Sequence, residues 1–237
     1  MLGVIVNVIT VIFGSCIGLL FKKGIPEKVS SAAMTGLGAC TLYIGISGSL
    51  CGENVLILIA SVVLGAIVGT LLNIDGAINA FAGKIEACFR KSGENVSLAE
   101  GLVSATLLFC VGSMTVTGSI QAGLTGDNSV LITKAMLDLV SSMMLASSLG
   151  AGVLLSSVSV LVIQGGLVLL AGLLSPLMSA GAVNEMTCAG SLLIIMIGTN
   201  LMRITKIKVA DFLPAIVFAP VIYNLLPLFE KLGQIFA

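Results

Sequence analysis

A carboxylate and an ammonium group lie one helical turn apart inside a long apolar segment. Asp138 is the one carboxylate well inside such a segment, about 10 Å from its end, and Lys134 precedes it by four residues. An unpaired charge at that depth costs at least about 2.5–3.5 kcal/mol. Two arrangements would satisfy Asp138: a structural ion pair with Lys134, or a cation site from which Lys134 extends toward the membrane surface, leaving the carboxylate to bind a proton or Na+. Ser141 and Ser142 follow at spacings that place two hydroxyls near the same helix face.

A run of small and hydroxyl-bearing residues forms the second candidate site. The sequence from Gly112 to Gln121 is rich in residue types that favour helix weakly. Such a run can unwind and present carbonyls and hydroxyls to an ion where the irregular backbone faces protein or water. The alternative is a close helix-packing face. The candidate ligands in the run are Ser113, Thr115, Thr117, Gly118, Ser119 and Gln121.

Amide side chains also fall inside apolar segments. Asn7, Gln164 and Asn200 each need a hydrogen-bond partner there, and we include all three among the candidate site residues. Taken singly, each is more typical of a contact that links two helices than of a ligand site.

The elements that must position these residues are transmembrane helices. The chain has 237 residues, of which 57% are hydrophobic and 9% charged, whereas a soluble domain is about 25% charged. Apolar blocks of about 20 residues follow one another, and that length crosses the hydrocarbon of a bilayer. The sequence therefore predicts an all-α polytopic membrane protein in a lipid bilayer. Its net charge of zero gives no indication of a nucleic-acid partner.

The residue types disfavour several kinds of chemistry. There is no histidine, and the six cysteines are scattered without a CxxC pair, so nothing indicates a zinc site or a redox motif. Hydrolysis inside a membrane needs a nucleophile with a base, a carboxylate pair or a metal. We therefore expect no enzymatic activity, no cofactor and no firm metal site beyond Na+ at Asp138. Serine–lysine chemistry that uses Lys134 stays formally open.

Eight segments are predicted to cross the membrane, some of them broken or kinked. They cover residues 2–21, 31–50, 55–73, 99–121, 130–149, 153–176, 186–202 and 210–229. The expected break within 130–176 is Gly150-Ala151-Gly152. With both termini outside, nine of the eleven basic residues fall on the cytoplasmic side, as the positive-inside rule requires. The acids near span ends are expected to face water: Glu27, Glu100, Glu185, Asp211 and Glu230.

Spans one to three are predicted to recur upside down as spans six to eight. Met34-Thr35-x-x-Gly38 leads to Ile44-Gly45, and Met186-Thr187-x-x-Gly190 leads to Ile197-Gly198 with one extra residue. An offset of five spans inverts the second copy, a common plan in secondary transporters. The chain is then a single transmembrane domain over 1–237: a first repeat over about 1–75, a cytoplasmic amphipathic connection over 76–98, a central pair over 99–152 and a second repeat over about 153–230.

Several of these stretches resemble a known family. They are Gly112-Ser113-Met114-x-Val116-x-Gly118-Ser119-Ile120-x-x-Gly123-Leu124-x-Gly126-Asp127, Lys134-x-x-x-Asp138, Gln164-Gly165, Gly198-x-Asn200-Leu201 and Leu213-Pro214-Ala215. Together they resemble the domain-of-unknown-function 554 (YqgA/YdfK-like) family of uncharacterised prokaryotic membrane proteins, over essentially the whole chain. The resemblance implies a multi-pass protein of the bacterial inner membrane, in a family sometimes described as a candidate sodium channel or pump.

The repeat, the polar fourth span and Asp138 favour a secondary transporter or ion pathway for a small solute or monovalent cation, with Na+ or H+ coupling. The alternative is a non-transporting membrane scaffold or sensor partner, although the short loops offer little surface for docking. Pairs of small residues at Gly14/Gly18 and Gly65/Gly69 permit close helix approach, either within one subunit or across a homodimer.

Overall fold

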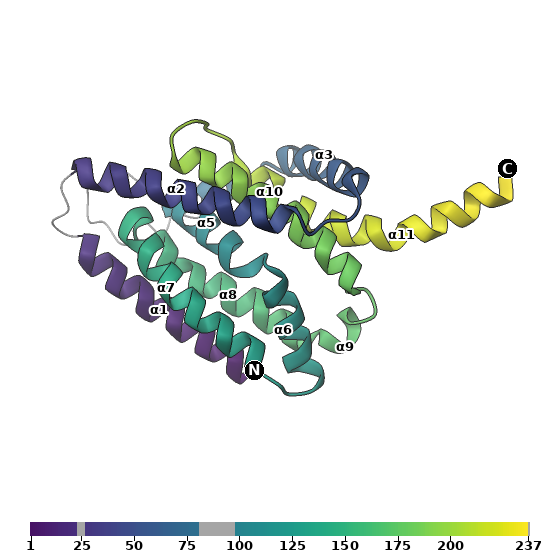
Figure 1. The fold of residues 1–237 in the computed structure, drawn as a ribbon, viewed down its shortest axis with the longest axis horizontal. Helices are drawn as coiled ribbons and strands as arrows, with labels where there is room; N and C mark the ends of the chain where they lie inside the picture. The colour runs from purple at the N-terminus through teal and green to yellow at the C-terminus, as the bar shows by residue number, and fades with distance from the viewer. Residues whose placement is uncertain (23–26, 81–97, 237) are drawn as a thin grey trace.

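The computed structural model describes residues 1–22, 27–80 and 98–236, and only the backbone of 22, 27–30, 33, 34, 37, 113 and 227–236. These ranges contain helices and no β-strand, as predicted. The helices are α1 (Leu2–Lys22), α2 (Glu27–Ser49), α3 (Val55–Leu71), α5 (Leu98–Cys110), α6 (Ser113–Leu124), α7 (Ser129–Leu149), α8 (Gly152–Leu169), α9 (Ala171–Leu174), α10 (Ala180–Leu201), the 3₁₀ helix η1 (Val209–Phe212) and α11 (Ala215–Phe236) (Figure 1). Residues 74–80 are also helical. Most of the predicted amphipathic connection, 81–97, lies outside the described residues.

Several of the described helices are suited to crossing a membrane. Five qualify singly by length and hydropathy, and two bent pairs bring the number to seven. The bent pairs are Val55–Leu71 with Ile74–Ala80 and Leu98–Cys110 with Met114–Leu124. The chain is therefore a polytopic helical membrane protein. Seven of the eight predicted spans correspond to these segments, and the remaining one corresponds to α2, which has 23 residues but is less apolar than α1.

Helix directions support counting α2 as a crossing. Gly14 faces Leu139 and Gly18 faces Met143, so α1 and α7 run side by side in the same direction (Figure 1). Two parallel spans require an even number of crossings between the start of one and the start of the other. α1, α2, α3 and the bent pair α5–α6 supply an even number, whereas without α2 the number would be odd.

The chain reverses at Gly150, where the sequence predicts a break. α7 ends at Leu149 and α8 begins at Gly152. Gly150 has a φ of 79°, a left-handed value that glycine adopts without steric cost. α8 then returns alongside α5, and Gly101 and Gly152 each lie against the backbone of the other helix.

The contact between α2 and α10 has a pattern that fits the predicted inverted repeat. A Cβ added at Gly38 would lie 2.9 Å from the Gly198 carbonyl oxygen, and one added at Gly45 would lie 2.9 Å from that of Ser191. The repeat equates Gly38 with Gly190 and Gly45 with Gly198. Exchanging the two helices under this equivalence turns the contact between Gly38 and Gly198 into one between Gly190 and Gly45. The one extra residue of the second copy shifts Gly190 to Ser191, which gives the observed contact between Gly45 and Ser191. The pairs that the repeat would make equivalent, α1 with α8, α2 with α10 and α3 with α11, are each in contact.

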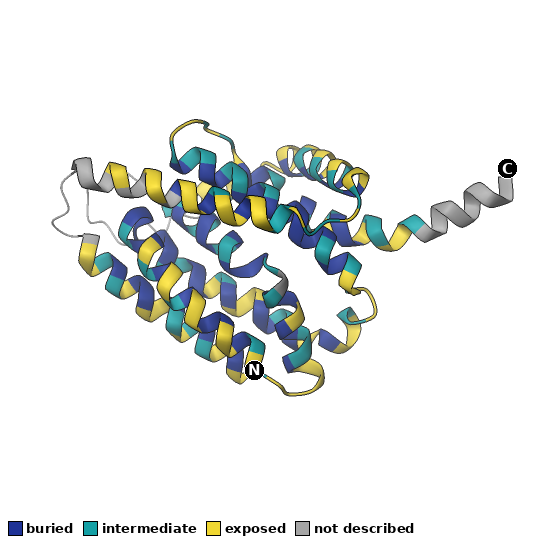
Figure 2. Ribbon diagram, in the orientation of Figure 1, coloured by how far each residue is buried: buried dark blue, intermediate teal, exposed yellow. Residues whose placement is uncertain are grey.

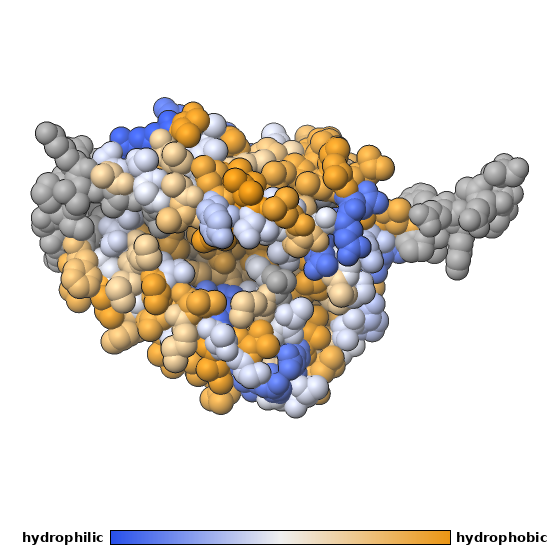
Figure 3. Space-filling view, in the orientation of Figure 1, coloured by the Kyte–Doolittle hydropathy of each residue, from blue (hydrophilic) through white to orange (hydrophobic). Residues whose placement is uncertain are grey.

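Apolar side chains face outward as well as inward. Leu2, Phe13, Leu56 and Val162 are among the large hydrophobic residues that are exposed. Exposed residues line the outer faces of the helices (Figure 2), and hydrophobic side chains cover much of the visible surface (Figure 3). An apolar surface of this extent is expected to contact lipid.

Two acids that were expected to face water are buried instead. Glu185 and Asp211 are 1% and 6% exposed. The Glu185 carboxylate accepts hydrogen bonds from the Glu53 and Asn54 N–H groups (2.8 and 2.9 Å), just before α3. Asp211 accepts the Asp75 N–H (2.9 Å) at the start of helix 74–80. Both carboxylates satisfy N–H groups at a helix start, where negative charge is favoured, and these partners are remote in sequence.

Replacing Glu185 with alanine should destabilise the protein. The part-buried Glu53 and Asn54 N–H groups would lose their acceptor, at up to about 1–3 kcal/mol for each group. Thermal unfolding in detergent measures the effect, with Glu53→Ala as the control because the Glu53 side chain is exposed. Equal melting temperatures for the two variants would show that the carboxylate contributes nothing to this turn.

Candidate functional site

The fourth span is broken at its middle, but over a shorter stretch than expected. α5 ends at Cys110 and α6 begins at Ser113, and the bend across this region is 59°. Gly112 is extended (φ −61°, ψ 148°), and the Thr115 hydroxyl donates to the Phe109 carbonyl across the break (2.9 Å). Residues 113–121 are regular helix, so of the two alternatives for this run the unwound one holds only at Gly112. The Val111 N–H donates to the Leu107 carbonyl and the Thr115 hydroxyl to that of Phe109, so the irregularity is confined to Val111 and Gly112.

Lys134 and Asp138 form a buried ion pair against this break. They are 5% and 6% exposed, and the Lys134 ammonium contacts the Asp138 carboxylate. The ammonium also lies 5.9 Å from the centre of the Phe109 ring, at the end of α5. Lys134 therefore does not extend to the membrane surface. The carbonyl end of a helix carries partial negative charge, which favours a cation at this position.

Two amides from the predicted repeat-equivalent spans extend the pair into a network. The Asn7 amide of α1 donates to the Gln164 carbonyl oxygen of α8 (3.1 Å), and both residues are 0% exposed. The Asn7 side chain also lies beside the Asp138 carboxylate and interacts with it. The two amides therefore connect α1, α7 and α8 at the level of the ion pair.

Two buried polar atoms beside this network have no hydrogen-bond partner among the described residues. They are Gln164 Nε2 and Ser119 Oγ. Gly123 of α6 faces Val168 of α8. Ser119 and Gln164 lie one turn earlier on these two helices, so they are at the same level of the bundle. Unpaired polar atoms at membrane depth are costly, and a small polar ligand or water between the helices would satisfy both. We call Asn7, Thr115, Ser119, Lys134, Asp138 and Gln164 the polar cluster.

Other predicted site residues lie outside the polar cluster. Ser141 is exposed, and the buried Ser142 donates to the Leu139 carbonyl of its own helix (3.0 Å). Thr117 is exposed, and Gly118 packs against Val130. On α6 and α7, some of these residues therefore pack inside the bundle and others lie at its surface. The Ser113 side chain lies outside the described part of the chain.

Gln121 binds at the loop that follows α6. Its amide donates to the Asp127 carboxylate (2.8 Å). The pKa of Asp127 is lowered, chiefly because its carboxylate accepts the Ser129 backbone N–H. Asn128, in the same loop, accepts the Gly3 N–H at the start of α1 (2.9 Å). These contacts fix the end of the bundle where α1 and α7 begin.

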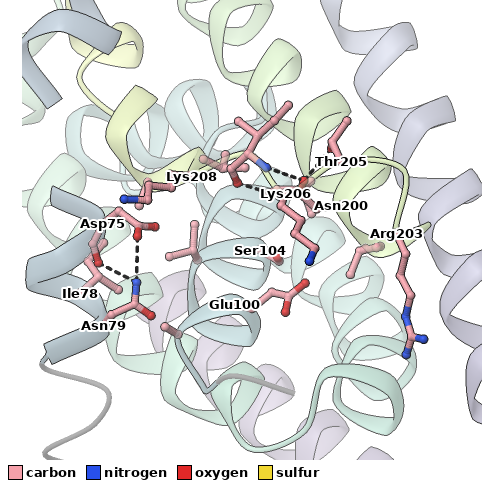
Figure 4. A pocket seen from close by; sticks show the side chains of 17 residues that line it. Asp75, Ile78, Asn79, Glu100, Ser104, Asn200, Arg203, Thr205, Lys206 and Lys208 are labelled. Atoms are coloured by element: carbon pink, nitrogen blue, oxygen red, sulfur yellow. Dashed lines mark hydrogen bonds between the residues drawn. The ribbon is translucent and has the colours of Figure 1, made fainter. Parts of the chain in front are cut away.

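Asn200 lies at the opposite end, beside a cavity that sequence reasoning missed. Its side chain binds the Ile207 backbone and the Thr205 hydroxyl, so it holds the loop after α10 rather than joining the polar cluster. The cavity measures about 560 Å³ and lies between helix 74–80, α5, the end of α10 and this loop (Figure 4). We call it the basic-end cavity after Arg203, Lys206 and Lys208, which line it. The three basic residues mark this end in the sequence, but their spacing does not predict a cavity.

An apolar layer separates the cavity from the polar cluster. Ser104 lines the cavity, and Val111 at the break lies about 10 Å further along the chain by helical rise. Leu107 and Phe109, both 1% exposed, lie between them and pack in one core cluster with Ile197 and Leu201 of the cavity wall. In this conformation the cavity is therefore closed toward the polar cluster.

Comparison with known proteins gives matches over nearly the whole chain. The family described as "Protein of unknown function (DUF554)" matches residues 2–224. The chain belongs to this family. It is similar to "Uncharacterized membrane protein YdfK" of Bacillus subtilis (strain 168), with 33% identity over 226 residues that cover 94% of the chain and 95% of the relative. "Uncharacterized protein YqgA" of Escherichia coli (strain K12) is 29% identical over 221 residues, covering 92% and 94%. No solved structure matches the chain significantly.

Proposed function

We propose that this protein is a secondary transporter or ion pathway whose polar cluster binds a monovalent cation, Na+ or H+. The observation that carries the proposal is the Lys134–Asp138 pair at membrane depth, placed against the break in the fourth span. Ionisable residues inside spans typically mark ion pathways and proton relays. Broken helices with a site at their ends are common in transporters.

Lys134 acts in this proposal as a resident cation that competes with the transported one. In the present conformation its ammonium neutralises Asp138. An arriving proton or Na+ would neutralise the carboxylate in its place and release Lys134. The oxygens of Asn7 and Gln164 and the carbonyls at the end of α5 are suitable further ligands for Na+, since hard cations prefer oxygen.

The apolar layer supplies the barrier that such a mechanism needs. A conducting path that stayed open on both sides would dissipate a gradient, whereas a closed layer allows exposure of the site to one side at a time. The layer meets the break in the fourth span, where Val111 and Gly112 are non-helical. The positive-inside rule favours a cytoplasmic position for the basic end, and our proposal takes the membrane to be an inner membrane with both termini outside.

Cation flux into liposomes tests the proposal. Purified protein should move Na+ or H+ down a gradient, and Asp138→Asn should reduce the rate about 10- to 100-fold, because a charged ligand contributes about 1.5–3 kcal/mol. Ser119→Ala should weaken apparent Na+ affinity through loss of one oxygen.

Ser141→Ala is the matched control, since Ser141 lies on the same helix as Asp138 with its side chain exposed. It should leave flux at the wild-type rate. The proposal fails if wild-type protein moves no cation above empty liposomes, or if a folded Asp138→Asn variant transports as well as the wild type.

A further inference from the structure

We infer that the basic-end cavity binds a small zwitterion, a molecule with one ammonium and one anionic group. The inference names a substrate class for the proposed transporter and rests on that proposal for movement, though not for binding. A volume of about 560 Å³ falls within the range of about 300–1,000 Å³ that is usual for small-molecule sites.

The wall formed by α5 offers groups that suit an ammonium. Glu100 and Ser104 lie on successive turns of α5 and line the cavity (Figure 4). Ser104 is 2% exposed and Glu100 is half-buried, so both groups face the cavity from within the bundle. An ammonium has three N–H groups to donate, and a carboxylate and a hydroxyl accept them.

The facing loop offers groups that suit an anion. Lys206 extends into the space between the labelled side chains, Lys208 lies on the side of Asp75, and Arg203 extends away from them (Figure 4). A simple cation would meet repulsion from the lysines, and a simple anion would meet repulsion from Glu100. A ligand that carries both charges matches both sides of the cavity.

Hydrogen bonds hold these charges apart before any ligand arrives. The Asn200 carbonyl oxygen accepts the Ile207 N–H (2.9 Å), and its amide donates to the Ile207 carbonyl (2.8 Å), which fixes the backbone between Lys206 and Lys208. The Asp75 carboxylate accepts the Asn79 amide of its own helix (3.0 Å), and Glu100 faces the cavity from α5. A site organised in advance loses less entropy on binding.

Two sources share this chemistry: free amino acids and the phosphoethanolamine headgroup of a lipid. The test uses the full chain in nanodiscs of phosphatidylglycerol, which has no ammonium group. Calorimetry would compare L-alanine and phosphoethanolamine with acetate, inorganic phosphate and methylammonium. We expect one or both zwitterions to bind at least about tenfold more tightly than the singly charged probes.

Glu100→Gln and Lys206→Gln should each weaken zwitterion binding about tenfold, the effect of losing one charged contact. Glu53→Gln removes a charge at the opposite end of the bundle, so this variant should bind as the wild type does. Alanine binding that persists in discs containing phosphatidylethanolamine supports a free solute. Phosphoethanolamine binding that those discs suppress supports the lipid headgroup.

Equal affinity for inorganic phosphate and phosphoethanolamine, unchanged in Glu100→Gln, would overturn the inference, as would binding of no probe. The two proposals fail separately. Zwitterion binding without cation flux would refute the transport function alone, and Asp138-dependent flux without zwitterion binding would refute this inference alone.

Discussion

Replacing Lys134 with methionine is expected to lower the free energy of unfolding by about 3–5 kcal/mol, the usual cost of leaving one buried charge without its partner. Methionine keeps most of the side-chain volume, so the loss measures the charge rather than a cavity. Asp138, 6% exposed, would keep only the Asn7 contact. Thermal unfolding in sodium-free detergent buffer checks the prediction. If Asp138 is a cation site, added Na+ should raise the melting temperature of Lys134→Met more than that of the wild type.

The double variant Lys134→Met with Asp138→Leu separates structure from function. Replacing both members of a buried pair with apolar residues is often neutral, or stabilising by about 1–4 kcal/mol. We therefore expect wild-type stability or better together with complete loss of flux. If Lys134→Met alone were as stable as the wild type in sodium-free buffer, the charge of Lys134 would not be needed to balance Asp138. A stable double variant that still transported cations would show that the pair plays no part in transport.

Alanine at both Gly14 and Gly18 is expected to separate α1 from α7 and to destabilise the protein severely. Added Cβ atoms would collide with the Ser142 hydroxyl and with the Leu139 and Met143 carbonyl oxygens. Because two of these obstacles are backbone, the helices must move apart, at a cost of about 1–3 kcal/mol for each overpacked position and occasionally more. The separation would also displace Asn7 from Gln164 and Asp138. Melting temperature and yield of monodisperse protein measure the effect.

Gly166→Ala is the matched control, because a Cβ added at this helical glycine meets no atom within 4 Å. Alanine favours helix over glycine by about 1 kcal/mol, so this variant should be as stable as the wild type or slightly more. A double Gly14/Gly18 variant with the same stability would mean that α1 and α7 are not packed at these glycines.

Much of the membrane fold could be predicted because each span carries its own signal. Apolar length identifies the helices, and Gly150 identifies the reversal between α7 and α8, because both depend on local sequence. The fourth span was correctly expected to break, but the extent of the break was not predictable. Thr115 satisfies the Phe109 carbonyl across the break, and only the folded backbone shows this.

The sequence also identified every residue of the polar cluster, each as a separate candidate. Asn7, Ser119, Lys134, Asp138 and Gln164 stand out because polarity inside an apolar span is costly wherever it occurs. The sequence could not distinguish these residues from Ser141, Gln121 and Asn200, which are equally polar. Ser141 faces outward, Gln121 binds a loop and Asn200 holds another loop.

Sequence alone thus determined that the chain is a bundle of membrane helices with rare polar positions, since hydropathy and helical period are local properties. Tertiary structure decided that Lys134 pairs with Asp138 rather than reaching the surface, that Glu185 and Asp211 are buried, and that a cavity forms at the basic end. Each of these outcomes depends on which helices become neighbours. The contacts of Glu185 with residues 53 and 54 and of Asp211 with Asp75 join segments more than a hundred residues apart, and no local pattern encodes them.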